Sequence, residues 1–120
     1  MNKLNVSYIC YIFNEHIIQP DNDVKDREER AYYTPLLVGA LQELMRQKII
    51  SLEEKITKKP ARQVEEELDF VGYEDAYNFT YSLTIFMEAL LERPLHEKYC
   101  KVLFSKLMSQ IDSIEKKIKE

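Results

Sequence analysis

The C-terminal part of the chain repeats apolar side chains at alternating steps of four and three residues, which places them along one side of a helix. The positions are Cys100, Phe104, Leu107, Ile111, Ile114 and Ile118. Such a stripe leaves water only when the helix packs along another helix. The spacing therefore predicts a helix from about Leu95 to the C-terminus, packed lengthwise against other helices.

Glycine and proline are too scarce for a protein with many tight turns, because 120 residues contain two glycines and four prolines. Sheet proteins need more of both at their turns, so long elements with few connections are expected. The length suits one domain with its own core. We expect a mainly α-helical bundle of four to five helices, forming a single domain over residues 1–120.

The first helix is predicted over residues 4–18, where two periodicities compete. Apolar residues within this segment fit one face of a helix, although residues 6–12 also alternate as in a strand. The length of the segment and the absence of a turn signal before Pro20 favour the helix. Residues 20–23, Pro-Asp-Asn-Asp, then predict a turn or loop.

A second helix is predicted over residues 26–48. Its first turn is rich in acidic residues, which interact favourably with the positive end of a helix dipole. Pro35 lies well inside this span and lacks the backbone N–H that a helix interior needs. We therefore expect a kink at Pro35 or a restart of the helix with Thr34 as its N-cap.

The segment over residues 49–58 is rich in β-branched residues, and its apolar positions do not share one helical face. It predicts either a short β-hairpin or a continuation of the preceding helix. Pro60 closes this segment, because the residue before a proline is disfavoured in helical geometry. Residues 61–70 predict a short helix that ends near Gly72 in the left-handed conformation.

Residues 73–93 also carry two patterns, a strand-like alternation over residues 77–85 and a complete helical face. No turn separates Ile85 from the helical sequence that follows, so one long helix ending at Pro94 is predicted. Three tyrosines drift along a second face of this helix: Tyr73, Tyr77 and Tyr81, here called the tyrosine face. No charged residue occurs between Asp75 and Glu88. Such a helix is either central to the bundle or presents a face to a partner.

Charge is segregated along the chain, whose formal net charge is −4. Residues 41–64 hold six basic and three acidic residues, whereas residues 65–75 hold six acidic residues and no basic one. Residues 93–120 again carry an excess of three positive charges. The acidic total argues against a dedicated nucleic-acid binder. A solvated surface of mixed charge is the expected outcome.

Residues able to carry chemistry are few. His96 and Cys100 share a helix face, but zinc needs two further ligands, and the remaining histidine and cysteine are His16 and Cys10. Cys100 is interpreted as a small residue of the apolar stripe, where a reactive thiolate is disfavoured. The sequence contains no P-loop, dinucleotide fingerprint or nucleophile elbow. We expect neither an enzyme nor a bound metal or cofactor; a small hydrolase or metal-binding protein is the weakest alternative.

A DNA-binding regulator is a further alternative. The helix up to Lys48, followed by residues 49–57 and two lysines, is similar in order to the helix and wing of a winged-helix domain, with the last helix as a dimerisation helix. A compact helix–turn–helix ahead of it is missing.

Residues 36–44 (LLVGALQEL), continuing through residues 48–52 (KIISL), resemble a helix-to-strand segment of Golgi phosphoprotein-3-like proteins. The resemblance covers at most the first half of the chain, and members of that family are much longer. The phosphoinositide site that it implies cannot be placed on particular residues of this sequence.

We expect a small cytoplasmic protein-binding module, acting as an adaptor, inhibitor or regulator through helix-mediated contacts. The expected contact residues are the tyrosine face and the end of the apolar stripe, here called the isoleucine stripe: Ile111, Ile114 and Ile118. Pairing of two copies through the C-terminal helix is a further prediction. No apolar run is long enough for a membrane span. Abundant Lys, Ile, Tyr and Asn indicate a bacterial or phage source.

Overall fold

A computed structural model of the chain describes residues 2–18, 26–92 and 95–120, with side chains from residue 6 onward in these ranges. Within them lie five α-helices and one π-helical segment, and no strand. The elements are α1 (Asn2–Ile12), η1 (Phe13–Ile17), α2 (Arg27–Thr57), α3 (Ala61–Glu67), α4 (Glu74–Leu91) and α5 (Glu97–Lys119). The predicted mainly α-helical bundle is confirmed.

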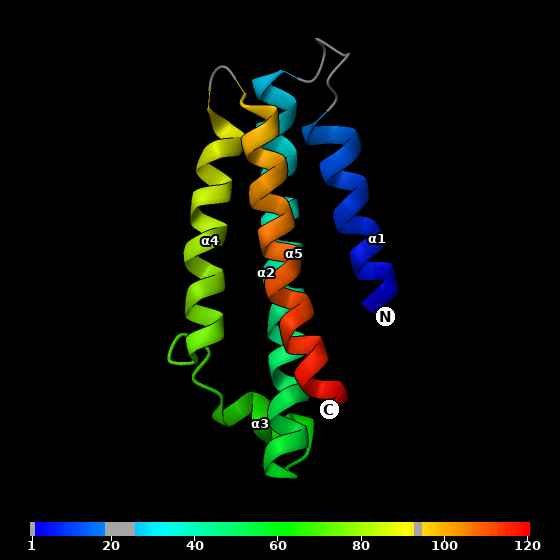
Figure 1. Cartoon of the computed structure of the whole chain (residues 1–120), viewed down its shortest axis with the longest axis vertical. Coiled ribbons are helices and arrows are strands. Elements are labelled where there is room, and N and C mark those ends of the chain that lie inside the picture. Colours follow the sequence, from blue (N-terminus) through cyan, green and yellow to red (C-terminus); the bar gives the residue numbers. More distant parts are fainter. Residues whose placement is uncertain (1, 19–25, 93–94) are drawn as a thin grey trace.

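The long helices run up and down an elongated bundle of 51 × 25 × 23 Å (Figure 1). α1 and α4 run in one direction along the long axis and α2 and α5 run in the other, while the short α3 lies near one end (Figure 1). α2, α4 and α5 pack against one another, and α1 and η1 pack on α2. α4 therefore lies at one edge of the bundle, on the side opposite α1 (Figure 1).

The first helix is confirmed, but it ends in a π-helical turn that the periodicity did not predict. The N–H of Ile18 donates to the carbonyl of Phe13 at 2.9 Å, five residues back. The wider turn buries Phe13 and Ile17 together, and the Phe13 ring stacks on Phe104 of α5 with ring centroids 4.1 Å apart. The loop predicted at residues 20–23 lies outside the described residues.

α2 begins where the sequence predicted and continues well beyond it. The side chain of Asp26 caps the helix by accepting from the N–H of Glu29. Pro35 lies inside one helix, so the alternative of a restart capped by Thr34 is wrong; the Thr34 hydroxyl donates to the Arg30 carbonyl at 2.6 Å. Pro35 has no N–H to donate to the carbonyl of Ala31, four residues back; the Thr34 hydroxyl bonds the neighbouring Arg30 carbonyl and does not replace that bond.

The alternative of a β-hairpin at residues 49–58 is wrong, because α2 remains helical through Thr57. Tertiary contacts override the local preference of β-branched residues for strands here. Leu52 is buried in the core, and the Lys55 ammonium donates to the carbonyls of Lys117 and Glu120 at the end of α5. The wing of the winged-helix alternative, and the strand implied by the Golgi phosphoprotein-3-like resemblance, are therefore absent from this segment.

The short helix α3 begins at Ala61, directly after Pro60, as predicted, whereas the segments before and after it differ from the prediction. α2 ends at Thr57, and its C-cap residue Lys58 adopts the left-handed conformation with φ of 61°. α3 ends at Glu67, earlier than predicted, and Gly72 does not have a positive φ. The expected left-handed cap at Gly72 is therefore wrong.

α4 and α5 confirm the two predicted C-terminal helices. α4 buries the face that contains Phe79, Leu83 and Phe86, so the helical pattern and not the strand-like alternation determines this segment. Pro94, predicted to end the helix, lies outside the described residues, and the helix ends at Leu91. None of the described helices combines the length and the apolarity needed to cross a membrane.

The charges that are segregated along the sequence are brought together in space. Basic residues of α2 and of its C-terminal connection approach the acidic residues of α3: Arg46 bonds Glu65 at 3.1 Å, and Lys59 bonds Glu67 at 2.8 Å. On α5, Lys117 bonds Asp75 of α4 at 3.1 Å. Much of the segregated charge is thus paired within the bundle.

Candidate docking surface and cavity

The tyrosine face lies on the outer side of α4. Tyr77 and Tyr81 are 63% and 65% exposed, one helical turn apart, whereas Phe79 and Phe86 on the opposite side are fully buried. α4 thus fills the core with one face and still presents two large aromatic side chains to solvent. Tyrosine is enriched at protein interfaces, because its side chain combines a large apolar area with a hydroxyl group that can form a hydrogen bond.

Tyr73, the third residue of the tyrosine face, is placed differently. It is the N-cap residue of α4 and is half-buried between α4 and the C-terminal part of α2. Burial, followed by the negative charges of Glu53 and Asp75, raises the pKa of the Tyr73 hydroxyl. The hydroxyl therefore stays neutral and can donate a hydrogen bond to the Glu53 carboxylate.

Tyr73 also forms one wall of a cavity of about 300 Å³ between the end of α2, α3 and residues 68–73. Its apolar lining comes from the buried Val64 and the half-buried Leu68. Its polar lining contains three carboxylates and one ammonium: Glu53, Glu67, Asp69 and Lys59. We call this hollow the acidic cavity.

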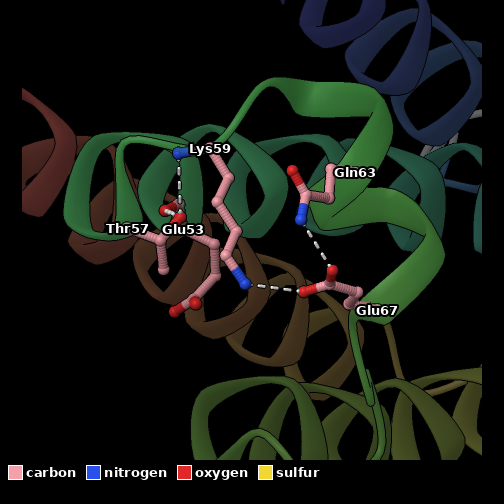
Figure 2. Close-up of polar contacts among 5 residues, drawn as sticks. All are labelled: Glu53, Thr57, Lys59, Gln63 and Glu67. Atoms are coloured by element: carbon pink, nitrogen blue, oxygen red, sulfur yellow. Dashed lines mark hydrogen bonds and ion pairs between the residues drawn. The ribbon is translucent and has the colours of Figure 1, made fainter.

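One of these carboxylates is held by neighbouring side chains. Figure 2 shows Lys59 extending between Glu53 and Gln63 to reach Glu67, with its Nζ 2.8 Å from one carboxylate oxygen. Gln63 Nε2 donates to the other oxygen at 2.9 Å. The hydrogen bond from Lys59, and then that from Gln63, lowers the pKa of Glu67.

The turn that closes the cavity places Gly72 against the side chain of Asp69. The N–H of Gly72 donates to the carbonyl oxygen and to the carboxylate Oδ1 of Asp69, both at 3.2 Å. A Cβ at this position would collide with the same carboxylate. Sequence reasoning missed this site, although an aspartate three residues before a glycine is a signal for a turn of this kind.

The isoleucine stripe, the second predicted contact region, faces the interior of the bundle. Ile111 and Ile114 are 4% and 1% exposed, and Ile118 is half-buried against the same core cluster. The structure therefore does not bring the stripe together with the tyrosine face. Pairing of two copies through the stripe stays a prediction.

The residues weighed for metal or thiol chemistry lie apart or are enclosed. Cys100 is fully buried, and this burial raises the pKa of its thiol to about 11. His96 is exposed at the start of α5, while His16 of η1 bonds Glu29 at 3.0 Å and stacks on Tyr33. In the part of the chain that the structure describes, no group of three or more His, Cys, Asp or Glu side chains is arranged to hold a metal.

Comparisons with known proteins give no match. No family model matches the sequence, and neither a curated protein nor a solved structure shows significant similarity to it.

Proposed function

We propose that this chain is a small protein-binding module that docks a partner on the tyrosine face of α4. The observation that supports the proposal is the exposure of Tyr77 and Tyr81 on a helix whose opposite face is buried in the core. Because a buried face already fixes α4 in the bundle, the two tyrosines are not needed to hold the helix. Tyrosine is among the residues that contribute most to binding at protein interfaces.

The position of α4 supports the same proposal. It lies at the edge of the bundle, and its outward side is covered by neither α2 nor α5, the two helices on which it packs (Figure 1). A rigid helix presents its side chains without the ordering cost that a loop would add to binding. The module would act as an adaptor, inhibitor or regulator, with no chemical step of its own.

Site-specific photo-crosslinking in the native host tests this proposal. A photoreactive phenylalanine replaces Tyr77 or Tyr81 in turn, and Tyr32 or Tyr99 serves as the matched control, because both are exposed tyrosines outside α4. The proposal predicts that one protein is captured from both α4 positions and from neither control. Capture of no protein, or of the same proteins from all four positions, would contradict it.

A further inference from the structure

Two carboxylates of the acidic cavity have no basic side chain as a partner in the part of the chain that the structure describes. Lys59 pairs with Glu67, so this pair is neutral overall. Among the described residues, neither Glu53 nor Asp69 forms an ion pair; Glu53 accepts a hydrogen bond from the Tyr73 hydroxyl, and Asp69 accepts the N–H of Gly72 within its turn. The cavity therefore carries about two uncompensated negative charges next to an apolar wall.

Tyr73 connects the acidic cavity to the tyrosine face, because it lines the cavity and lies one helical turn before the exposed Tyr77. Tyr73 lines the cavity, and the N–H of Tyr77 donates to the Tyr73 carbonyl at 2.9 Å in the first turn of α4. The exposed rings of Tyr77 and Tyr81 then follow at successive turns. A partner seated on the tyrosines therefore extends directly to the mouth of the cavity.

The helix that carries the tyrosine face contributes negative charge only. α4 contains no Lys or Arg, and Glu74 and Glu88 are exposed near its two ends. Two cations lie beside Tyr73: Lys117 bonds Asp75, and Lys55 bonds the carbonyl oxygens of Lys117 and Glu120. An aromatic centre with an acidic border is complementary to a partner that is apolar and basic.

We infer that the partner of the tyrosine face carries a lysine or arginine side chain that enters the acidic cavity between Glu53 and Asp69. The inference rests on the proposed function and specifies the chemistry of the partner. The aliphatic stem of such a side chain covers Val64 and Leu68, while its charged end meets the two carboxylates. An arginine would in addition stack on an aromatic ring such as that of Tyr73.

A titration with Nα-acetyl-arginine amide, followed by the amide chemical shifts of the isotope-labelled protein, tests this inference. The neutral Nα-acetyl-norleucine amide is the matched probe. We expect saturable shifts over residues 53–73 with the arginine derivative and none with the norleucine derivative. The double variant Glu53→Gln/Asp69→Asn should weaken binding about tenfold or more, since charge-assisted hydrogen bonds are lost.

The control variant Glu43→Gln/Asp112→Asn removes the same charge from exposed positions outside the cavity and should leave the titration unchanged. Equal shifts with both probes, or an unchanged titration of the Glu53→Gln/Asp69→Asn variant, would overturn the inference. These results do not depend on Tyr77 and Tyr81. A partner that crosslinks at both tyrosines but binds the cavity variant at full strength would therefore overturn the inference alone and leave the proposed function standing.

Discussion

Arg30 donates a hydrogen bond from its Nε to the main-chain carbonyl of Leu90 at 2.8 Å, joining residues sixty positions apart. Its Nη2 donates to the carbonyl of Glu92, also at 2.8 Å. The side chain is only 5% exposed and fixes the start of α2 to the end of α4. A cation at this position satisfies carbonyls that have no partner within the helix and interacts favourably with the negative end of the α4 dipole.

Replacing Arg30 with methionine should lower the free energy of unfolding by about 2–4 kcal/mol, because a buried carbonyl then loses its donor. Chemical denaturation followed by circular dichroism measures this change. Arg27→Met is the matched control, since Arg27 is exposed in the first turn of the same helix. Equal stability of the two variants would show that the contact between Arg30 and α4 contributes nothing.

Lys48 of α2 and Glu115 of α5 form an ion pair at 2.7 Å in which the lysine is much more buried than the glutamate. The two single substitutions should therefore differ. Glu115→Gln leaves a buried ammonium without its counter-charge and should cost about 1–3 kcal/mol. Lys48→Met leaves a carboxylate that reaches water and should cost less than about 1 kcal/mol. Denaturation of both variants checks the order, and a larger loss in Lys48→Met would contradict it.

The same pair predicts a loss of stability in acid. The hydrogen bond from Lys48 is the main reason that the pKa of Glu115 lies below its usual value of 4.5. A carboxyl whose pKa is lowered by folding stabilises the folded state above the unfolded pKa, and this contribution disappears as the pH falls through the folded pKa. Stability should therefore decrease below about pH 4.5, and less steeply in Lys48→Met. An identical acid dependence of the variant and the parent protein would contradict this account.

Ile114 was predicted to contact a second copy of the chain, but in the structure it packs in the core, and the two roles can be tested separately. Its side chain is 1% exposed inside the bundle, so Ile114→Ala should lower the free energy of unfolding by about 2–4 kcal/mol through the cavity it leaves. Lys106→Ala, at an exposed position of α5, should change stability by less than about 0.5 kcal/mol. Sedimentation equilibrium of the parent protein tests pairing directly. A mass of 14.3 kDa at all concentrations would show that the isoleucine stripe serves the core alone.

The helices that could be predicted from the sequence are those in which apolar residues at helical spacing form a full face within one continuous segment. α5 and α4 meet this condition, since Leu107 and Phe79 each belong to a full helical face. Residues 49–57 do not, because their helix depends on partners more than sixty residues away, such as the carbonyls that accept from Lys55. No local pattern contains this information.

The candidate site was predictable in part. The tyrosine face follows from periodicity, and two of its three members are exposed as an interface requires. The acidic cavity was not predictable, because α2, α3 and the turn at Gly72 form it together. For the isoleucine stripe, the sequence could not show which surface it contacts. A narrow apolar stripe gives the same sequence pattern whether it packs against its own core or against a second chain.

Docking on the tyrosine face is tested most directly by the affinity of the crosslinked partner for the intact chain and for two double variants, measured by isothermal titration calorimetry. Tyr77→Ala/Tyr81→Ala removes the exposed tyrosines of α4, and Tyr32→Ala/Tyr99→Ala removes two exposed tyrosines elsewhere. If the partner docks on Tyr77 and Tyr81, the first variant binds at least about tenfold more weakly with its fold intact, and the second binds like the parent. Equal affinity of the first variant and the parent protein would contradict docking on the tyrosine face.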